Sequence, residues 1–370
     1  MKILIATDKF KGSLSAQQVC AAIANGILSI DRNAQVTLHP LADGGDGSLE
    51  VLNNHFDLEK IQCATTDPLG REVMAHYLVS SSGEAFIEVA AASGMVLLKP
   101  EERNPLKTSS KGTGTLIVDA MSKGVSHINI LLGGSATNDG GTGILQALGF
   151  DFLDEDGKSI LPRGETLYQI HQIVPPGDNQ RLSSCSFSLW CDVTNPFFGT
   201  RGAAHVFAHQ KGANSAMIQQ LDDGLKNFSE IIRKTNGKNV SEMPGAGAAG
   251  GIAGGLVGLL NADIVSGASQ IMQLTRFEEQ VAAHDVIITG EGSLDEQSLN
   301  GKVVDGVAKL AHRHRKEVSL ICGVNQLSTA KLSGLGIKKC LEIMKIAPSQ
   351  EVAMKQAEQF LQELGAVVLI

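Results

Sequence analysis

The 370-residue sequence has few aromatic residues, few prolines and no excess of basic charge. Aromatic residues make up 4% of the chain, which leaves little material for the stacking platforms that bind nucleic-acid bases. The chain has 31 Lys and Arg residues against 39 Asp and Glu, which gives a net charge of −8. It therefore lacks the excess of basic residues that is typical of a nucleic-acid binder. Ten prolines and no Gly-x-y period exclude collagen and Pro-rich chains. We therefore expect no nucleic-acid partner.

Cysteine and histidine show no metal-binding or disulfide pattern. The six cysteines are scattered without a Cys-x-x-Cys pair, as is typical of reduced cysteines in a cytoplasmic protein. No histidine has His-Glu-x-x-His spacing, so zinc is not expected. The apolar run of residues 3–6 is too short for a signal peptide, and the uncharged residues 244–262 are mostly glycine and alanine. We therefore expect a cytoplasmic protein with no membrane span.

Glycine, by contrast, is abundant, at 41 residues, and hydrophobic residues make up 43% of the chain. This much apolar material can bury a large core, so the composition excludes a disordered chain. The length predicts about two domains. The composition therefore indicates a globular protein with much of its glycine available for loops.

The two ends of the chain alternate strand and helix signals. Residues 3–7 and 35–39 have the pattern of strands, each with a helix after it, and Ser15 with Gln18 predicts a capping box at the first helix. Near the C-terminus, residues 285–289 and 318–322 predict strands, 302–312 and 352–364 predict helices, and 290–301 predict a loop. Successive βα units imply a parallel sheet with right-handed crossovers.

The middle of the chain follows another pattern. Residues 71–79 and 84–89 are strand-like runs on either side of a Ser-Ser-Ser-Gly turn, which predicts an antiparallel hairpin. We therefore predict an α/β fold of two domains. Residues 1–66 and 285–370, from both chain ends, form a parallel α/β domain, and residues 67–284 form an inserted mixed α/β domain.

Glycine and acidic residues gather where predicted strands end, in residues 8–13, 43–47, 133–141 and 289–295. Open α/β sheets bind ligands at this edge, and Gly-rich turns at helix starts offer free N–H groups to phosphate. Carboxylates beside a phosphate are explained by a divalent metal, normally Mg²⁺. Lys11 and Lys302 supply positive charge for a moving phosphoryl group. Together these features favour phosphoryl transfer, although turn chemistry alone explains Asp and Gly in any one loop.

The common phosphate-binding motifs are not matched. Gly301-Lys302 is followed by Val303, and Glu296 stands where a P-loop needs its first glycine. Residues 245–250 satisfy Gly-x-Gly-x-x-Gly, but Met243-Pro244 precedes them in place of a strand. The match therefore lacks the preceding strand that a dinucleotide fingerprint requires.

Five strings, taken together, resemble the bacterial glycerate kinase family, type I. They are residues 8–13 (DKFKGS), 40–47 (PLADGGDG), 133–141 (GGSATNDGG), 245–251 (GAGAAGG) and 289–295 (TGEGSLD), in the family's order and over essentially the whole chain. Two positions depart from the family's pattern: Lys9 stands where serine is expected, and Asp46 where glutamate is usual.

The resemblance implies an enzyme that phosphorylates D-glycerate with ATP and Mg²⁺. It implies the 2-hydroxyl as acceptor, giving 2-phosphoglycerate, with 3-phosphoglycerate as the competing outcome. It also implies a Rossmann-like domain with an inserted second α/β domain, and the cleft between the two domains is then the expected active site. A homodimer is left open as the oligomeric state.

Candidate roles follow from that resemblance. The residues placed against the nucleotide phosphates are Asp8, Ser13, Gly44, Gly45, Gly133, Gly134, Ser135, Asn138, Gly290 and Gly292. The metal candidates are Asp43, Asp46, Glu291 and Asp295. Lys11 and Lys302 are candidates for the transferring phosphoryl group, and Asp192 or Asp139 for the base that accepts the hydroxyl proton. Arg71 is the candidate for the glycerate carboxylate, because arginine pairs with carboxylates in a bidentate manner.

Two rival functions stay open at this point. An NAD(P)-dependent oxidoreductase is suggested by the Gly-x-Gly-x-x-Gly match and predicts binding of NADH. A non-catalytic protein whose two domains close on a small anion is the other alternative, and it predicts no release of ADP.

Overall fold

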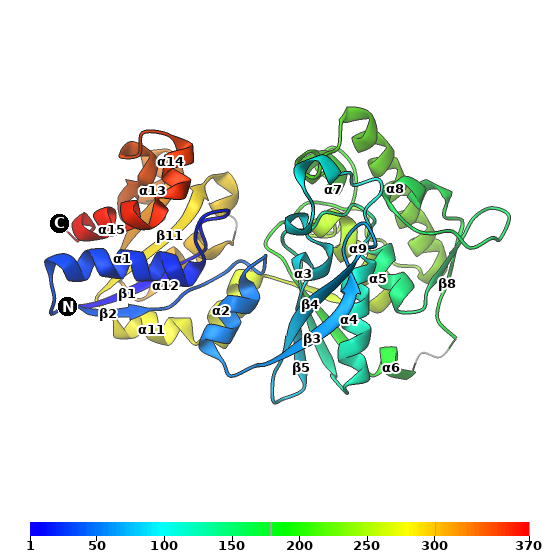
Figure 1. Ribbon diagram of the computed structural model, residues 1–370, viewed down its shortest axis with the longest axis horizontal. Helices are drawn as coiled ribbons and strands as arrows, with labels where there is room; N and C mark the ends of the chain where they lie inside the picture. The colour runs from blue at the N-terminus through cyan, green and yellow to red at the C-terminus, as the bar shows by residue number, and fades with distance from the viewer. Residues whose placement is uncertain (178–179, 300, 370) are drawn as a thin grey trace. The chain divides into compact units, whose positions relative to one another are not determined.

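The computed structural model describes residues 1–177, 180–299 and 301–369 of the chain (Figure 1). The chain forms two compact units. The terminal unit comprises Met1–Asp43, Glu50–His55 and Ser266–Ile370, and the inserted unit comprises Gly44–Leu49 and Phe56–Val265. Each unit has its own sheet and its own apolar core.

The terminal unit is built on a five-stranded sheet in the order β13-β12-β11-β1-β2, in which every neighbouring pair is parallel. The strands are β1 (Lys2–Thr7), β2 (Gln35–Leu38), β11 (Val286–Leu294), β12 (Glu317–Asn325) and β13 (Ile337–Glu342). The helices are α1 (Ala16–Ile30), α10 (Gly267–Leu274), α11 (Phe277–Ala283), α12 (Val303–Arg313), α13 (Thr329–Gly334), α14 (Gln350–Lys355) and α15 (Ala357–Val367), with short 3-10 turns η5 (Glu296–Leu299) and η6 (Ile343–Lys345). The predicted parallel α/β architecture is confirmed.

The start of α1 shows how local sequence places a helix. The Ser15 side chain accepts a hydrogen bond from the Gln18 backbone N–H, and the Gln18 side chain accepts one from Ser15 N, as the capping box predicts. Val19, Ile23 and Ile27 recur at helical spacing and are all buried in the core of the terminal unit.

The inserted unit is built on a six-stranded mixed sheet in the order β10-β9-β6-β5-β4-β3. β10, β9, β6 and β5 run parallel, whereas β5, β4 and β3 pair antiparallel, which confirms the predicted hairpin. Its strands are β3 (Glu59–Thr66), β4 (Glu72–Val79), β5 (Glu84–Glu88), β6 (His127–Leu131), β9 (Ser186–Trp190) and β10 (Asp263–Val265), and β7 (Asp151–Leu153) pairs separately with β8 (Gln172–Val174).

The helices of the inserted unit are α3 (Ala90–Ser93), α4 (Lys111–Ser122), α5 (Thr142–Ala147), α6 (Gln180–Ser183), α7 (Ala203–Phe207), α8 (Ser215–Asn236) and α9 (Ala248–Leu260). The 3-10 turns are η1 (Met95–Leu97), η2 (Pro100–Glu102), η3 (Gly164–Gln169) and η4 (His209–Lys211). The remaining helix, α2 (Ser48–His55), has residues in both units. No helix in the described part of the chain is long and apolar enough to cross a membrane.

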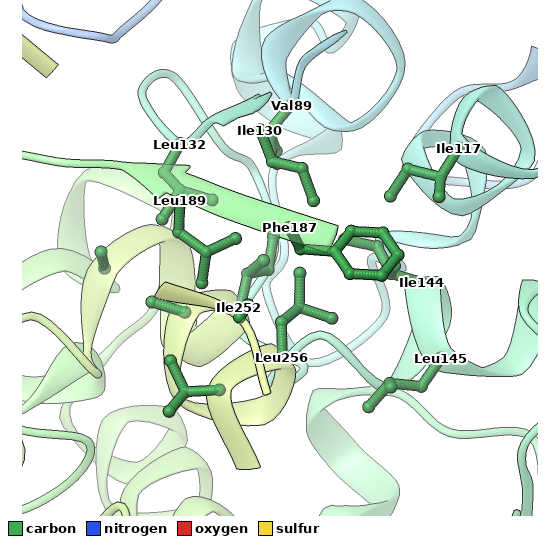
Figure 2. Packing of buried hydrophobic residues seen from close by; sticks show 14 of the residues in the cluster. Val89, Ile117, Ile130, Leu132, Ile144, Leu145, Phe187, Leu189, Ile252 and Leu256 are labelled. Carbon is green, nitrogen blue, oxygen red and sulfur yellow. The ribbon is translucent and has the colours of Figure 1, made fainter. Parts of the chain in front are cut away.

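The core of the inserted unit gathers around β6 and β9 (Figure 2). Ile130 of β6 and Phe187 of β9 pack with Ile144 of α5 and with Ile252 and Leu256 of α9. Because α5 follows the 133–141 loop directly, this packing fixes the segment into which the loop leads.

Two predicted element boundaries are wrong. The loop predicted at 290–301 begins only after β11, which continues to Leu294. Gly290 lies within the sheet, between Thr7 of β1 and Ile321 of β12, and a Cβ there would lie 2.1 Å from the Ile321 carbonyl oxygen. The helix predicted at 352–364 is two helices, α14 and α15, which meet at Gln356.

His39 lies just beyond β2 in a buried aromatic cluster of the terminal unit. Its ring centroid lies 4.4 Å from that of His55 and 5.1 Å from that of Phe277, and its Nε2 lies 2.9 Å from the Thr275 hydroxyl. Burial, with a smaller contribution from His55 and His284, lowers the pKa of His39 from 6.5 to about 3. The folded protein therefore keeps this ring neutral at pH values where the unfolded chain protonates it.

We expect His39 to make the protein less stable in acid. Because the pKa is lower in the folded state, the stabilisation is complete above pH 6.5 and is lost as the pH falls toward 3, by up to about 1.4 kcal/mol per pH unit. Urea unfolding at several pH values should therefore show a shallower acid loss for His39→Phe than for the wild type, and exposed His312→Gln serves as the control. An unchanged slope in His39→Phe would contradict this assignment.

Candidate active site

The carboxyl edge of the terminal sheet carries a charged cluster, here called the acidic edge. Asp8 and Glu291 leave the sheet side by side, because Thr7 of β1 pairs with Gly290 of β11 and Asp8 N donates to the Gly290 carbonyl at 2.9 Å. The acidic edge comprises Asp8, Lys9, Asp43, Glu291, Asp295 and Lys302. The ammonium of Lys9 lies 3.8 Å from carboxylate oxygens of both Asp8 and Asp43.

Two carboxyl groups of the acidic edge have strongly shifted pKa values. Burial raises the pKa of Asp8 to about 7, and Asp43 adds to the rise while Lys9 and Lys302 oppose it. Burial also raises the pKa of Glu291 to about 7, opposed by Ser298 and Lys302 and reinforced by Asp8 and Asp295. Such concentrated, partly desolvated negative charge is stabilised by a bound cation.

The acidic edge offers oxygen donors that fit a hard cation such as Mg²⁺. The Glu291 Oε1 atom and the Thr289 hydroxyl are buried without a hydrogen-bond partner. Among the described residues, however, no three His, Cys, Asp or Glu side chains are grouped so as to hold a metal ion by themselves. Mg²⁺ commonly takes one or two carboxylates and completes its shell with water and substrate phosphates, so a full protein cage is not required.

The metal candidates come from both units. Asp43, Glu291 and Asp295 belong to the acidic edge, whereas Asp46 belongs to the inserted unit. The structure therefore does not assemble the four as one cluster within either unit, and their metal role stays a prediction.

In the inserted unit, two of the predicted glycine loops meet. We call residues 44–47 and 133–141 the glycine-loop pair. A Cβ on Gly133 would lie 2.3 Å from the Gly45 Cα, and one on Gly134 would lie 3.4 Å from the Asp46 Cβ. Only glycine at position 133 permits this backbone contact. Glu88, at the end of β5, accepts a hydrogen bond from Leu49 N at 2.8 Å and so holds the start of α2 beside the same loops.

Asp139 anchors the second loop from within. Its side chain is fully buried and accepts hydrogen bonds from the backbone N–H groups of Ser110, Gly141 and Gly143 and from the Ser110 hydroxyl. Burial raises the pKa of Asp139, and these hydrogen bonds oppose the rise. Because its two oxygens are already occupied, the geometry gives Asp139 a structural task, and the base role stays a prediction.

A buried lysine that the sequence analysis missed braces the same loop. Lys211, at the end of η4, is 3% exposed, and its ammonium donates to Ser135 Oγ at 2.9 Å and to the Thr137 carbonyl at 2.7 Å. Burial lowers the pKa of Lys211 to about 7, opposed by Asp139. The surrounding sequence, His-Gln-Lys-Gly, carries no motif that would have identified it.

Three buried side chains near the glycine-loop pair have polar atoms with no internal partner. The Asn138 amide is fully buried, and neither its oxygen nor its nitrogen makes a hydrogen bond. The hydroxyls of Thr137 and Ser48 are likewise buried without a partner. Unsatisfied buried groups of this kind are rare in folded proteins and are typical of positions where water or a ligand completes the hydrogen bonding.

Asp192 and Arg71 are the remaining candidates in the inserted unit. Asp192 lies just after β9 and is half-buried. The end of β9 lies beside the start of the 133–141 loop, because Leu132 N donates a hydrogen bond to the Trp190 carbonyl. The Arg71 guanidinium is paired with Asp67 (2.5 Å) and Glu102 (2.7 Å). This pairing argues against Arg71 as a glycerate ligand; both assignments stay predictions.

The remaining candidates lie in the terminal unit. Lys302 is half-buried at the start of α12 and belongs to the acidic edge, whereas Lys11 is exposed. Ser13 donates its hydroxyl proton to the Met354 carbonyl at 2.6 Å, so that proton is not available to a phosphate in this structure. Gly290 and Gly292 lie within β11, where a sheet and not a phosphate loop surrounds them. The phosphate roles of Ser13, Gly290 and Gly292 stay predictions.

The Gly-x-Gly-x-x-Gly match at residues 245–250 has a packing explanation. A loop, not a strand, precedes it, and it leads into α9. Gly140 N donates to the Gly250 carbonyl at 3.1 Å, and a Cβ on Gly255 would lie 1.9 Å from the Gly140 carbonyl oxygen. These glycines bring the backbone of α9 against the 133–141 loop.

Comparison with known proteins gives the class of this fold and site: the chain is an enzyme, a kinase. The model of the glycerate kinase family matches residues 3–369, and the chain belongs to that family. It is 43% identical to the glycerate 2-kinase of Escherichia coli K12 over 324 residues, 87% of this chain and 85% of the relative. It is 39% identical to a glycerate kinase of Halalkalibacterium halodurans over 369 residues, covering 100% of this chain and 97% of the relative.

A solved structure agrees with this assignment. The crystal structure of a protein assigned as glycerate kinase 2 from Salmonella typhimurium LT2 is 39% identical in sequence. It superposes with a TM-score of 0.81, over 99% of this chain and 96% of the other. The predicted family and fold class are therefore confirmed.

We expect Gly133→Ala to disrupt the glycine-loop pair. The added Cβ would overlap Gly45, so the loops must separate; we expect kcat/KM to fall by at least about tenfold and the free energy of unfolding by about 1–3 kcal/mol. Gly177→Ala, where a Cβ meets nothing within 4 Å, is the matched control in the same unit. Steady-state kinetics and urea unfolding check both variants, and wild-type kcat/KM in Gly133→Ala would contradict the contact's importance.

Proposed function

We propose that the protein transfers the terminal phosphoryl group of ATP to the 2-hydroxyl of D-glycerate, giving 2-phosphoglycerate and ADP. The observation that carries this proposal is the 43% identity to a glycerate 2-kinase over 87% of the chain. The competing 3-phosphorylation uses the same substrates and differs only in which hydroxyl is presented to the phosphoryl group.

The glycine-loop pair supports a phosphate-binding role in this reaction. Tight glycine turns expose backbone N–H groups, and Gly44 and Gly134 both have the left-handed conformation that such turns use. The unpartnered Asn138 amide and Thr137 hydroxyl provide further polar contacts in the same segment. In this proposal the pair binds anionic oxygens of the substrates.

The acidic edge supports a Mg²⁺ site. One or two of the carboxylates Asp8, Asp43, Glu291 and Asp295 would hold the ion, and the bound ion would neutralise charge on the phosphates of ATP. Lys9 and Lys302 keep the negative charge of this edge partly balanced in the protein itself. Lys302 is also the predicted cation for the phosphoryl group.

Asp192 is the proposed base. It would accept the proton of the attacking hydroxyl as the new O–P bond forms and the bond to the ADP oxygen breaks. Its carboxylate is half-buried at the carboxyl end of β9, whereas that of Asp139 is fully buried.

The proposed reaction is tested by ADP release with ATP and D-glycerate, and by phosphorus NMR of the product. We expect turnover with D-glycerate and not with L-glycerate. In a proton-coupled spectrum, phosphate on the 2-carbon appears as a doublet and phosphate on the 3-carbon as a triplet. A triplet would establish 3-kinase regiochemistry, and NADH binding without ADP release would favour the oxidoreductase alternative.

Two isosteric variants separate the base from the metal site. Asp192→Asn should lower kcat by about 10²–10⁴-fold at every Mg²⁺ concentration, because a proton acceptor is lost. Glu291→Gln should instead raise the Mg²⁺ concentration that gives half-maximal activity by at least about tenfold. Each variant is the control for the other in a titration of kcat against Mg²⁺. Near-normal kcat in Asp192→Asn, or an unchanged Mg²⁺ requirement in Glu291→Gln, would remove that residue from its role.

A further inference from the structure

Lys211 and Ser135 form a buried pair whose hydrogen-bond polarity is fixed when the lysine is protonated, the form that Asp139 favours. The lysine ammonium has three N–H donors and no acceptor, so its 2.9 Å contact with Ser135 Oγ requires the serine oxygen to accept. The same ammonium donates to the Thr137 carbonyl at 2.7 Å, which fixes it on the loop at two points. Lys211 is 3% exposed and Ser135 is 4% exposed, so water competes little for this contact.

Because the Ser135 oxygen accepts from Lys211, the Ser135 hydroxyl proton is not used in this contact and is available to another acceptor. A serine hydroxyl has one donor and two acceptor positions, and the lysine occupies an acceptor position. Within the described residues the Ser135 hydroxyl donates to no protein acceptor. A buried donor without an acceptor is costly, by the same argument that applies to the neighbouring Asn138 amide.

We infer that Lys211 is a positioning residue that makes Ser135 a hydrogen-bond donor to an anionic oxygen of a substrate. Ser135 directly follows Gly133-Gly134, where the glycine-loop pair is in closest contact. The ligand group must accept a hydrogen bond, as phosphate and carboxylate oxygens do, because the serine hydroxyl proton is the group left without a partner. This inference rests on the proposed function, since both substrates of that reaction carry such a group.

Asp139 complements Lys211 on the same loop. It accepts hydrogen bonds from the backbone N–H groups of Ser110, just before α4, of Gly141 in the loop and of Gly143 in α5. Lys211 instead donates to the Thr137 carbonyl and the Ser135 hydroxyl, so the segment from Ser135 to Gly143 is held through both N–H and carbonyl groups. The buried carboxylate also favours the charged form of the buried ammonium. Because Lys211 reaches Ser135 while Asp139 does not, only Lys211 sets the direction of the serine proton.

A double-mutant cycle in KM tests the inference. Ser135→Ala should raise KM by roughly tenfold to a hundredfold, the effect of losing a hydrogen bond to a charged group, for one substrate and not the other. An increase in KM for ATP identifies a phosphate, and an increase for D-glycerate identifies the carboxylate. Lys211→Met should raise the same KM, and the double variant should match Ser135→Ala within about twofold, because the lysine acts through the serine.

Conservative variants and controls distinguish positioning from general stability. Ser135→Thr keeps the hydroxyl and Lys211→Gln keeps a donor, so both should recover part of the lost affinity. Exposed Lys234→Met and Ser333→Ala should leave both KM values unchanged. Should Lys211→Met fail to fold, Lys211→Leu takes its place in the cycle.

Three results would overturn the inference: unchanged KM values in Ser135→Ala, effects that multiply in the double variant, or a lysine effect confined to kcat. Absence of turnover in the wild type would instead refute the proposed function. The same cycle is then measured as calorimetric dissociation constants for ATP and for D-glycerate, with the same expected pattern.

Discussion

The contact between the backbones at Gly133 and Gly45 is the constraint on which the inserted unit's candidate site depends. The two segments lie far apart in the sequence, and any side chain at position 133 would overlap the Gly45 Cα. Their contact sets Asp46 against Gly134 and holds the start of α2 near Glu88. The end of β6, the 44–47 loop and the first turn of α2 are thereby fixed to one another, which gives ligand-binding groups a defined geometry.

Buried charge then gives the 133–141 loop its rigidity. An isolated charge in a protein interior is costly, and both Asp139 and Lys211 meet this cost with hydrogen bonds of the matching kind. Neither charge is exposed enough to serve as a general counter-ion for solvent species. The acidic edge of the terminal unit differs, because burial there leaves two carboxyl groups with pKa values near 7, so that a cation would be needed to keep both ionised at neutral pH.

Local signals in the sequence predicted most of the fold and part of the site. The parallel strands, the hairpin and the capping box at α1 follow from short patterns, and the structure confirms them. What short patterns could not predict depends on tertiary contacts. The end of β11, at Thr289 or at Leu294, depends on β12 lying against Gly290. The pairing of Arg71 depends on Asp67 and Glu102. Lys211 gains its role from contact with a loop more than seventy residues away in the sequence.

The same difficulty explains why glycine alone cannot locate a binding site. The absence of a Cβ lets a phosphate approach backbone N–H groups, and it equally lets another backbone segment pass close by. Residues 245–250 match a dinucleotide pattern, yet the glycines of residues 250–255 allow α9 to lie against Gly140 and Thr137. The small residues of α9, whose sequence resembles a ligand-binding loop, thus pack against the 133–141 loop. That loop carries the polar groups without partners. Binding and support are distinguished here by the polar atoms left without partners, at Thr137 and Asn138, and not by the glycines themselves.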